Sequence, residues 1–128
     1  MRPCMRGPMP SGPSVADAFR LQDQVARLSA ERHDFAEFFR SPAGTLSLTV
    51  ARWPAGSIDE QQPHTEDEVY YVASGHGTLT IDGEVVQVGP GSIAFVAAGV
   101  EHRFGEIGQD LEVLVFWSPA RHANAPGS

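Results

Sequence analysis

The fold of this chain is decided by residues 56–68, which read GSIDEQQPHTEDE. This run places Gln62, His64 and Glu68 at even spacings on one extended segment. Side chains of a strand alternate between its two faces, so these three share a face unless a bulge intervenes. His102 lies on a later strand-like run. Two imidazoles, a carboxylate and an amide oxygen that converge inside a barrel would make a metal site.

Strand-like segments continue on both sides of this run. Leu46, Leu48 and Val50 alternate with small or polar residues, and Asp82-Gly83 is a strong two-residue hairpin signal. The remaining predicted strands cover 67–73, 78–81, 84–88, 92–96, 101–107 and 111–117, with a turn expected at 74–77. Seven or eight short strands with regular turns favour one antiparallel sandwich or barrel.

The chain ends are predicted to lie outside this barrel. Residues 1–13 and 119–128 read as flexible tails, and residues 14–43 as a helical arm. Apolar residues at helical spacing predict a helix over 15–30, and the phenylalanines of 33–40 fit another short helical turn that covers the barrel. The barrel itself is predicted to span residues 44–118.

The composition of the chain indicates one globular domain and excludes several kinds of partner and site. The 128 residues fit one domain, and 41% hydrophobic with 20% charged residues is ordinary for a globular protein. A net charge of −7 argues against nucleic acid and against an anionic membrane as partners. Cys4 is the single cysteine, which excludes an intrachain disulfide and a zinc–cysteine cluster. With no apolar run of about 20 residues and no secretory signal, we expect a cytoplasmic protein.

Two spaced motifs resemble those of the cupin superfamily of jelly-roll barrels. The first family motif is a glycine, five residues, His-x-His, three or four residues, Glu, six residues and a glycine. Gly56, Gln62, His64, Glu68 and Gly75 match it in every spacing, with glutamine in place of the first histidine.

The second motif is a glycine, five residues, Pro-x-Gly, two residues, His, three residues and Asn. Its positions fall on Gly91, Ala97, Gly99, His102 and Glu106, so alanine replaces the proline and glutamate the asparagine. The resemblance covers about residues 44–118 and implies an all-β, single antiparallel jelly-roll barrel with a short N-terminal helical extension.

The resemblance also implies a ligand set. The metal ligands of the family map onto His64, Glu68 and His102, with Gln62 at the fourth position. Two histidines and a carboxylate with open positions match the pattern of non-haem Fe(II), which we favour, while Mn, Zn, Ni or Co also fit. Gln62 either ligates weakly or orients a water or a substrate oxygen.

Two further residues are candidates for catalysis. Tyr70 has the parity of Glu68 and is expected to line the cavity, whereas Glu106 shares parity with His102. Glu106 is either a second carboxylate at the cavity or a residue of its rim, and we favour the rim. The phenylalanines of the later strands are expected in the core: Phe95, Phe104 and Phe116.

Taken together, the resemblance implies a metal-dependent enzyme of dioxygenase, isomerase or lyase type, with an oxygenase favoured, acting on a small polar molecule. The alternative is a non-catalytic barrel that binds or senses a small molecule through the same cavity. A third hypothesis, a decayed site, is disfavoured by the intact His64, Glu68 and His102. Many cupins pair, so a homodimer is expected, with residues 1–40 as a candidate arm.

Overall fold

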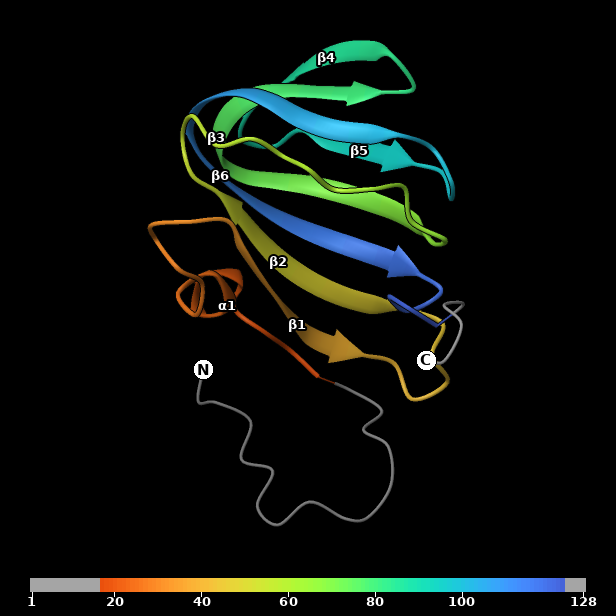
Figure 1. The fold of residues 1–128 in the computed structure, drawn as a ribbon. Coiled ribbons are helices and arrows are strands. Elements are labelled where there is room, and N and C mark those ends of the chain that lie inside the picture. The colour runs from red at the N-terminus through yellow and green to blue at the C-terminus, as the bar shows by residue number, and fades with distance from the viewer. Residues whose placement is uncertain (1–16, 124–128) are drawn as a thin grey trace.

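A computed structural model describes residues 17–123 of the chain. One short helix precedes a set of antiparallel strands (Figure 1). The elements are α1 (Leu21–Val25), β1 (Asp34–Arg40), β2 (Ser47–Trp53), β3 (Asp67–Ile81), β4 (Glu84–Val88), β5 (Ile93–Val96) and β6 (His102–Ser118). They form a single all-β jelly-roll barrel, as expected from the sequence.

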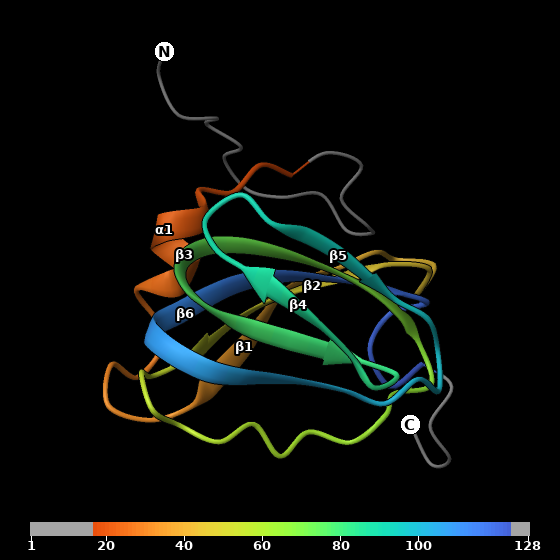
Figure 2. The ribbon, with the colours of Figure 1, turned by 90° about the horizontal axis from the view of Figure 1, so that it is seen from above.

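The sheet follows the order β1-β2-β6-β3-β4, and β5 pairs with β3 outside this path. The first half of β3 lies between β5 and the end of β6, and its second half between β4 and the start of β6. Both long strands curve strongly, so the sheet rolls up around its own interior (Figure 2).

The turn predicted at residues 74–77 is wrong. Residues 67–81 form one continuous strand, and its pairing with β6 shifts register repeatedly between Val72 and Thr78. Such bulges bend a strand without ending it. Gly75 sits in this bend with φ of 84°, a backbone conformation that glycine adopts at little cost. The two short strands predicted on each side of the turn are therefore the halves of β3.

The hairpin predicted at Asp82-Gly83 is confirmed. It joins β3 to β4, and Ile81 pairs with Glu84 across it. Asp82 and Gly83 have φ of 50° and 81°. Positive φ at both central residues is the pattern of a type I′ turn, which matches the twist of the flanking strands.

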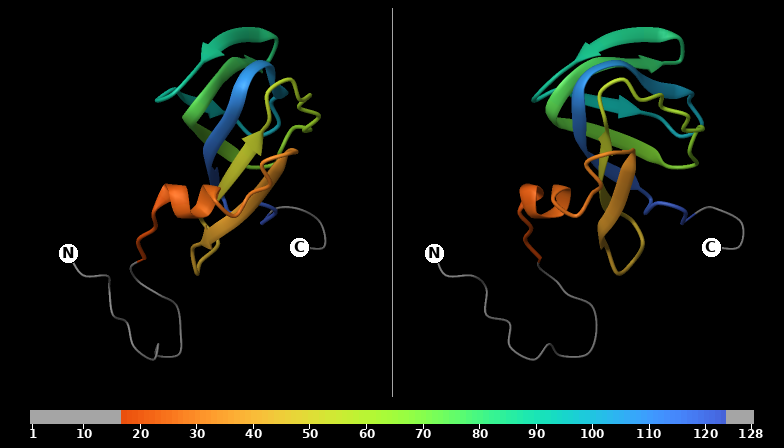
Figure 3. Two further views of the ribbon diagram at one scale, coloured as in Figure 1. Left: turned by 90° about the vertical axis from the view of Figure 1, so that its left-hand side faces the viewer. Right: turned by 60° about the vertical axis from the view of Figure 1, so that its left-hand side comes forward.

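The helical arm is only partly as predicted. The helix predicted over 15–30 is present, but among residues 17–30 it covers only α1. The helical turn expected over 33–40 is wrong, because β1 occupies Asp34–Arg40 and pairs with β2. Pairing satisfies the backbone groups of β1 that a helical turn would bond internally. The helix packs on the outer face of the sheet (Figure 3). There Val25 of the helix and Leu28, three residues after its end, pack with Val50. The part of the arm before residue 17 lies outside the described residues.

The core fills the inside of the rolled sheet. It is built mainly from alternate residues of β3 and β6, among them Tyr70, Leu79, Leu111 and Val113. Phe104 belongs to it as predicted. Phe95 and Phe116 do not: they point to the outer face of the sheet and are 59% and 36% exposed.

The predicted C-terminal tail begins later than residue 119. Ala120 is fully buried and donates its backbone N–H to the Gly44 carbonyl. Residues 119–123 are therefore docked against the barrel, and the rest of that predicted tail lies outside the described residues. No helix within residues 17–123 is long and apolar enough to cross a membrane.

Candidate metal centre

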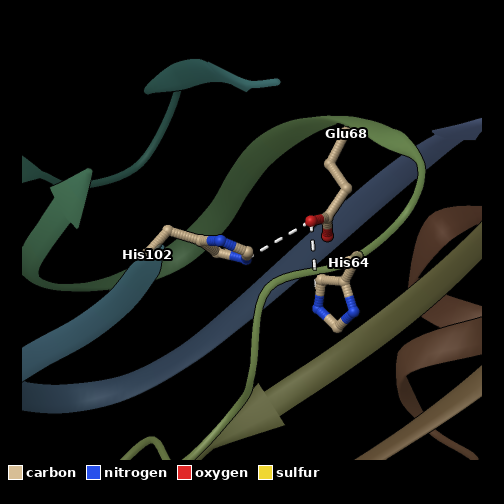
Figure 4. A group of neighbouring side chains, drawn as sticks. All are labelled: His64, Glu68 and His102. Carbon is tan, nitrogen blue, oxygen red and sulfur yellow. Dashed lines mark ion pairs between the residues drawn. The ribbon is translucent and has the colours of Figure 1, made fainter. Parts of the chain in front are cut away.

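Three predicted ligands converge at one point inside the barrel. Glu68 comes from β3, His102 begins β6, and His64 lies in the loop just before β3 (Figure 4). One ligand atom from each residue lies within 4.8 Å of the others. Oε2 of Glu68 is 3.3 Å from Nε2 of His102 and 3.9 Å from Nε2 of His64. The sequence prediction of this triad is confirmed as a spatial group.

The contact between Glu68 and His102 indicates that a cation belongs between them. Nδ1 of His102 lies 2.9 Å from the Val100 carbonyl, which only accepts, so Nδ1 carries a proton. Nε2 of a neutral ring then presents a lone pair to the carboxylate. Within the described chain, neither this Nε2 nor Oε2 of Glu68 has a hydrogen-bond partner, and both are buried. Two buried acceptors that face each other need a cation between them, either a proton on the imidazole or a metal ion.

The two histidines respond oppositely to this environment. Burial lowers the pKa of His64 below its ordinary value, against the negative charge of Glu68. Burial also works to lower the pKa of His102, but its contacts with Glu68 and the Val100 carbonyl outweigh it, and that pKa is raised. As pH rises, His64 therefore loses its proton before His102 does.

Gln62, predicted at the fourth ligand position, points away from the triad, and Gln61 lies beside the triad instead. Gln62 is exposed, and its amide donates to the Glu60 carbonyl. Residues 57–66 form no strand in this structure, so alternation does not govern which side chains point inward. The amide oxygen of Gln61 instead lies 3.2 Å from Nε2 of His64.

Asp59 fixes the orientation of Gln61. This buried carboxylate accepts the Gln61 amide N–H at 2.6 Å and the Phe104 backbone N–H at 2.9 Å. A carboxylate only accepts, so the Gln61 nitrogen must face Asp59 and its oxygen must face the triad. Gln61 therefore offers the amide oxygen that the sequence assigned to Gln62. Sequence reasoning missed both Gln61 and Asp59.

Tyr70 lies at the site as predicted. It is buried, and its hydroxyl donates to Oε1 of Glu68 at 3.0 Å. Burial, together with the negative charge of Glu68, raises the pKa of Tyr70 well above its ordinary value. The phenol therefore stays protonated near neutral pH, which suits a hydrogen-bond donor.

Glu106 does not join the group. It is exposed, in keeping with the rim position that we favoured, and it does not line the cavity beside the triad. Its φ of 43° marks a break in the alternation of β6, since Phe104 and Ile107 are both buried on either side of it. The equal parity of His102 and Glu106 in the sequence therefore does not bring their side chains together.

A cavity of about 100 Å³ opens beside the triad. Its apolar lining includes Trp53, Val115 and Trp117, and Trp117 packs edge-on against His64 with 4.9 Å between ring centroids. The full lining is His33, Phe35, Thr49, Ala51, Trp53, Gln61, His64, Glu68, Tyr70, Val115, Trp117 and Arg121. Sequence reasoning missed His33 and Arg121, because both fall outside the predicted barrel.

Comparisons with known proteins agree with this architecture. The family model for the cupin domain matches residues 49–118. An uncharacterised protein of Streptomyces coelicolor is 41% identical over 102 residues, which is 80% of this chain and 95% of that protein. An acireductone dioxygenase of Bacillus thuringiensis is 27% identical over 89 residues, 66% of this chain, but the match spans only 49% of its length.

Solved structures show the same fold at low identity. KdgF from Halomonas sp. superposes with a TM-score of 0.62 at 20% identity, over 70% of this chain and 80% of that one. A mutant salicylate 1,2-dioxygenase from Pseudoaminobacter salicylatoxidans, in complex with gentisate, gives 0.62 at 18% identity, over 77% of this chain and 30% of that one. At these identities the two structures support the assignment of the fold and nothing more specific.

Proposed function

The chain belongs to the cupin superfamily, and we propose that it is a metal-dependent enzyme that acts on a small polar molecule. One observation carries the proposal: the partnerless, buried acceptors of Glu68 and His102, 3.3 Å apart. A divalent ion satisfies both at once, and Nε2 of His64 supplies a third ligand atom. The oxygen of Gln61 is the candidate for a fourth.

Among metals we favour Fe(II), and Mn, Zn, Ni or Co remain compatible with the donor set. Two imidazoles and one carboxylate with open positions match non-haem iron, and the group found among residues 17–123 contains no cysteine that would favour a softer ion. The likeness to an acireductone dioxygenase supports an oxygenase among the possible enzymes. When bound, the ion would act as a Lewis acid toward substrate oxygens or, as iron, as a redox centre.

The residues around the triad hold it in place. Tyr70 fixes one oxygen of Glu68, and the Val100 carbonyl fixes the ring of His102. Asp59 does the same for Gln61. Such partners orient ligands and tune their basicity. The aromatic wall formed by Trp53 and Trp117 limits water around the substrate.

The remaining parts of the proposal concern partners and place. We propose a homodimer, a small-molecule substrate, no nucleic-acid partner and a cytoplasmic location. The net charge of −7 supports the exclusion of nucleic acid. An exposed apolar row on the outer face of the sheet, with Phe95 and Phe116 in it, supports the dimer. Residues 34–40 of the predicted arm already pair as β1 with β2 of their own chain, so the proposed dimer does not use their pairing.

The decisive experiment is elemental analysis of protein made without a histidine tag or nickel column. We expect about one equivalent of metal, lost in His64→Ala and in Glu68→Gln. Oxygen consumption in the presence of a substrate would support the enzyme if it disappears together with the metal. Metal with ligand-induced stabilisation but no turnover would favour the binding module. No metal after reconstitution would overturn the proposal.

A further inference from the structure

We propose that Arg121 is a specificity-determining residue, which holds the carboxylate of a small substrate at the opening of the cavity. The compact apolar body of that substrate would lie against Trp117 and the inner wall. This inference rests on the proposed function, because it assigns a substrate class to the same cavity. It starts from the guanidinium, which lines the cavity together with His64 and Glu68.

The Arg121 guanidinium lies over two aromatic rings. Its central carbon lies 4.8 Å from the ring centroid of Phe35 and 5.5 Å from that of Trp117. Cation–π contacts use the face of the aromatic ring and supply no hydrogen-bond acceptor atom. These two contacts therefore leave the N–H donors of the guanidinium available to a ligand.

No protein group among residues 17–123 uses those donors. The Arg121 guanidinium makes no hydrogen bond there. It forms no ion pair with the buried Glu66 or with the buried Glu68, which lines the same cavity. Oε2 of Glu66 is already occupied by the Thr65 hydroxyl and the His122 backbone N–H. An arginine that served only to neutralise these carboxylates would be expected to contact one of them.

The backbone of Arg121 is fixed in place. Its N–H donates to the Ser47 hydroxyl at 2.8 Å, and its carbonyl accepts from the Arg40 guanidinium at 2.6 Å. Ala120, just before it, is buried and bonded to the Gly44 carbonyl. The ends of β1 and β2 thus position Arg121 at the cavity, which is what a preorganised recognition residue requires.

The chemistry of the cavity selects the ligand. A guanidinium offers paired parallel donors that match a planar carboxylate. A cavity of about 100 Å³ with a largely aromatic and aliphatic lining suits a body no larger than a single ring. Arg121, His64 and Glu68 line the same cavity, so the cation and two of the metal ligands face the same space. A carboxylate at Arg121 would leave the rest of the substrate facing the triad.

The test uses benzoate and its neutral analogue benzamide as probes. Their affinities are measured by calorimetry on metal-stripped and Zn(II)-loaded protein, for the wild type, Arg121→Gln, Arg121→Lys and Arg27→Gln. Arg27 is an exposed arginine that does not line the cavity, so it controls for the change in net charge. We expect benzoate to bind at least about 10-fold more tightly than benzamide in both metal states. Arg121→Gln should weaken benzoate by about 10- to 100-fold and abolish that preference.

Arg121→Lys should lose part of the preference, and Arg27→Gln should lose none. Metal content should be unchanged in all variants. Benzoate binding that survives in Arg121→Gln but disappears when the metal is stripped would place the carboxylate on the metal and overturn the inference. Tighter binding of inorganic phosphate than of benzoate would overturn the substrate class. Arg121-dependent benzoate binding in a protein that never takes up metal would sustain this inference while the proposed enzyme fails.

Discussion

At the scale of single residues, the site depends on which of two adjacent glutamines turns inward. Gln61→Ala should lower metal affinity by about 10-fold, since it removes an oriented amide oxygen beside His64. Gln62→Ala is the matched control and should leave affinity unchanged, because its side chain is exposed. Competition with a fluorescent chelator measures both. A larger loss of affinity in Gln62→Ala than in Gln61→Ala would restore Gln62 as the fourth ligand, as the motif assigns it.

The pH dependence of metal binding is a second consequence at this scale. Both histidines must be neutral to ligate, and the pKa of His102 is raised while that of His64 is lowered. Affinity should therefore fall about tenfold per pH unit once pH drops below the raised pKa of His102. It should fall about a hundredfold per unit below the lowered pKa of His64, where a second proton competes. Zn(II) titrations from pH 8 to about pH 4 test this, and affinity unchanged over that range would contradict it.

These residues show how far the sequence reaches. His64, Glu68 and His102 were predictable because their spacing follows a family motif. Gln61 was not, because residues 57–66 form no strand and period two fails there. Arg121 was assigned to a tail, since nothing in residues 119–128 signals docking against Ser47 and Gly44. Contacts between segments far apart in sequence leave no local pattern to read.

At the scale of elements, the bend in β3 creates the site. His102 lies opposite Ile81, at the end of β3, whereas Glu68 lies near its start. In a straight strand these positions would be roughly 40 Å apart at about 3.3 Å per residue. Their side chains meet at 3.3 Å because the strand folds over. Alternating sequence predicts the two halves of β3, but it represents the bend only as an interruption near Gly75.

Gly75→Ala should therefore destabilise the fold more than an equivalent change elsewhere. An added Cβ at Gly75 would overlap the Asp110 carbonyl oxygen, in a backbone with φ of 84°. Gly83→Ala is the matched control, with φ of 81° and nothing within 4 Å. We expect Gly83→Ala to cost about 1 kcal/mol and Gly75→Ala about 2 kcal/mol more. Urea unfolding measures the difference, and equal losses would show that the close approach to β6 is not needed.

At the scale of the whole molecule, the outer face of the sheet carries an apolar row. Neighbouring strands place Phe95, Val69, Phe116 and Leu48 side by side across β5, β3, β6 and β2. Ile93, two residues from Phe95 on β5, is 71% exposed. The helix α1 covers the adjacent part of this face around Val50 and leaves the row open among the described residues. An apolar stripe of this kind is typical of an interface between protein subunits.

The homodimer should therefore depend on this row. Phe95→Glu and Phe116→Glu each place a charge where two copies would bury an aromatic ring, so light scattering should show conversion of dimer to monomer at micromolar concentration. Val85→Glu is the control, because Val85 is similarly exposed at 58% but lies on β4, away from the row. Metal content should stay unchanged, since neither phenylalanine lines the cavity. A wild-type monomer would refute the dimer, and a dimer that survives both substitutions would move the interface to another face.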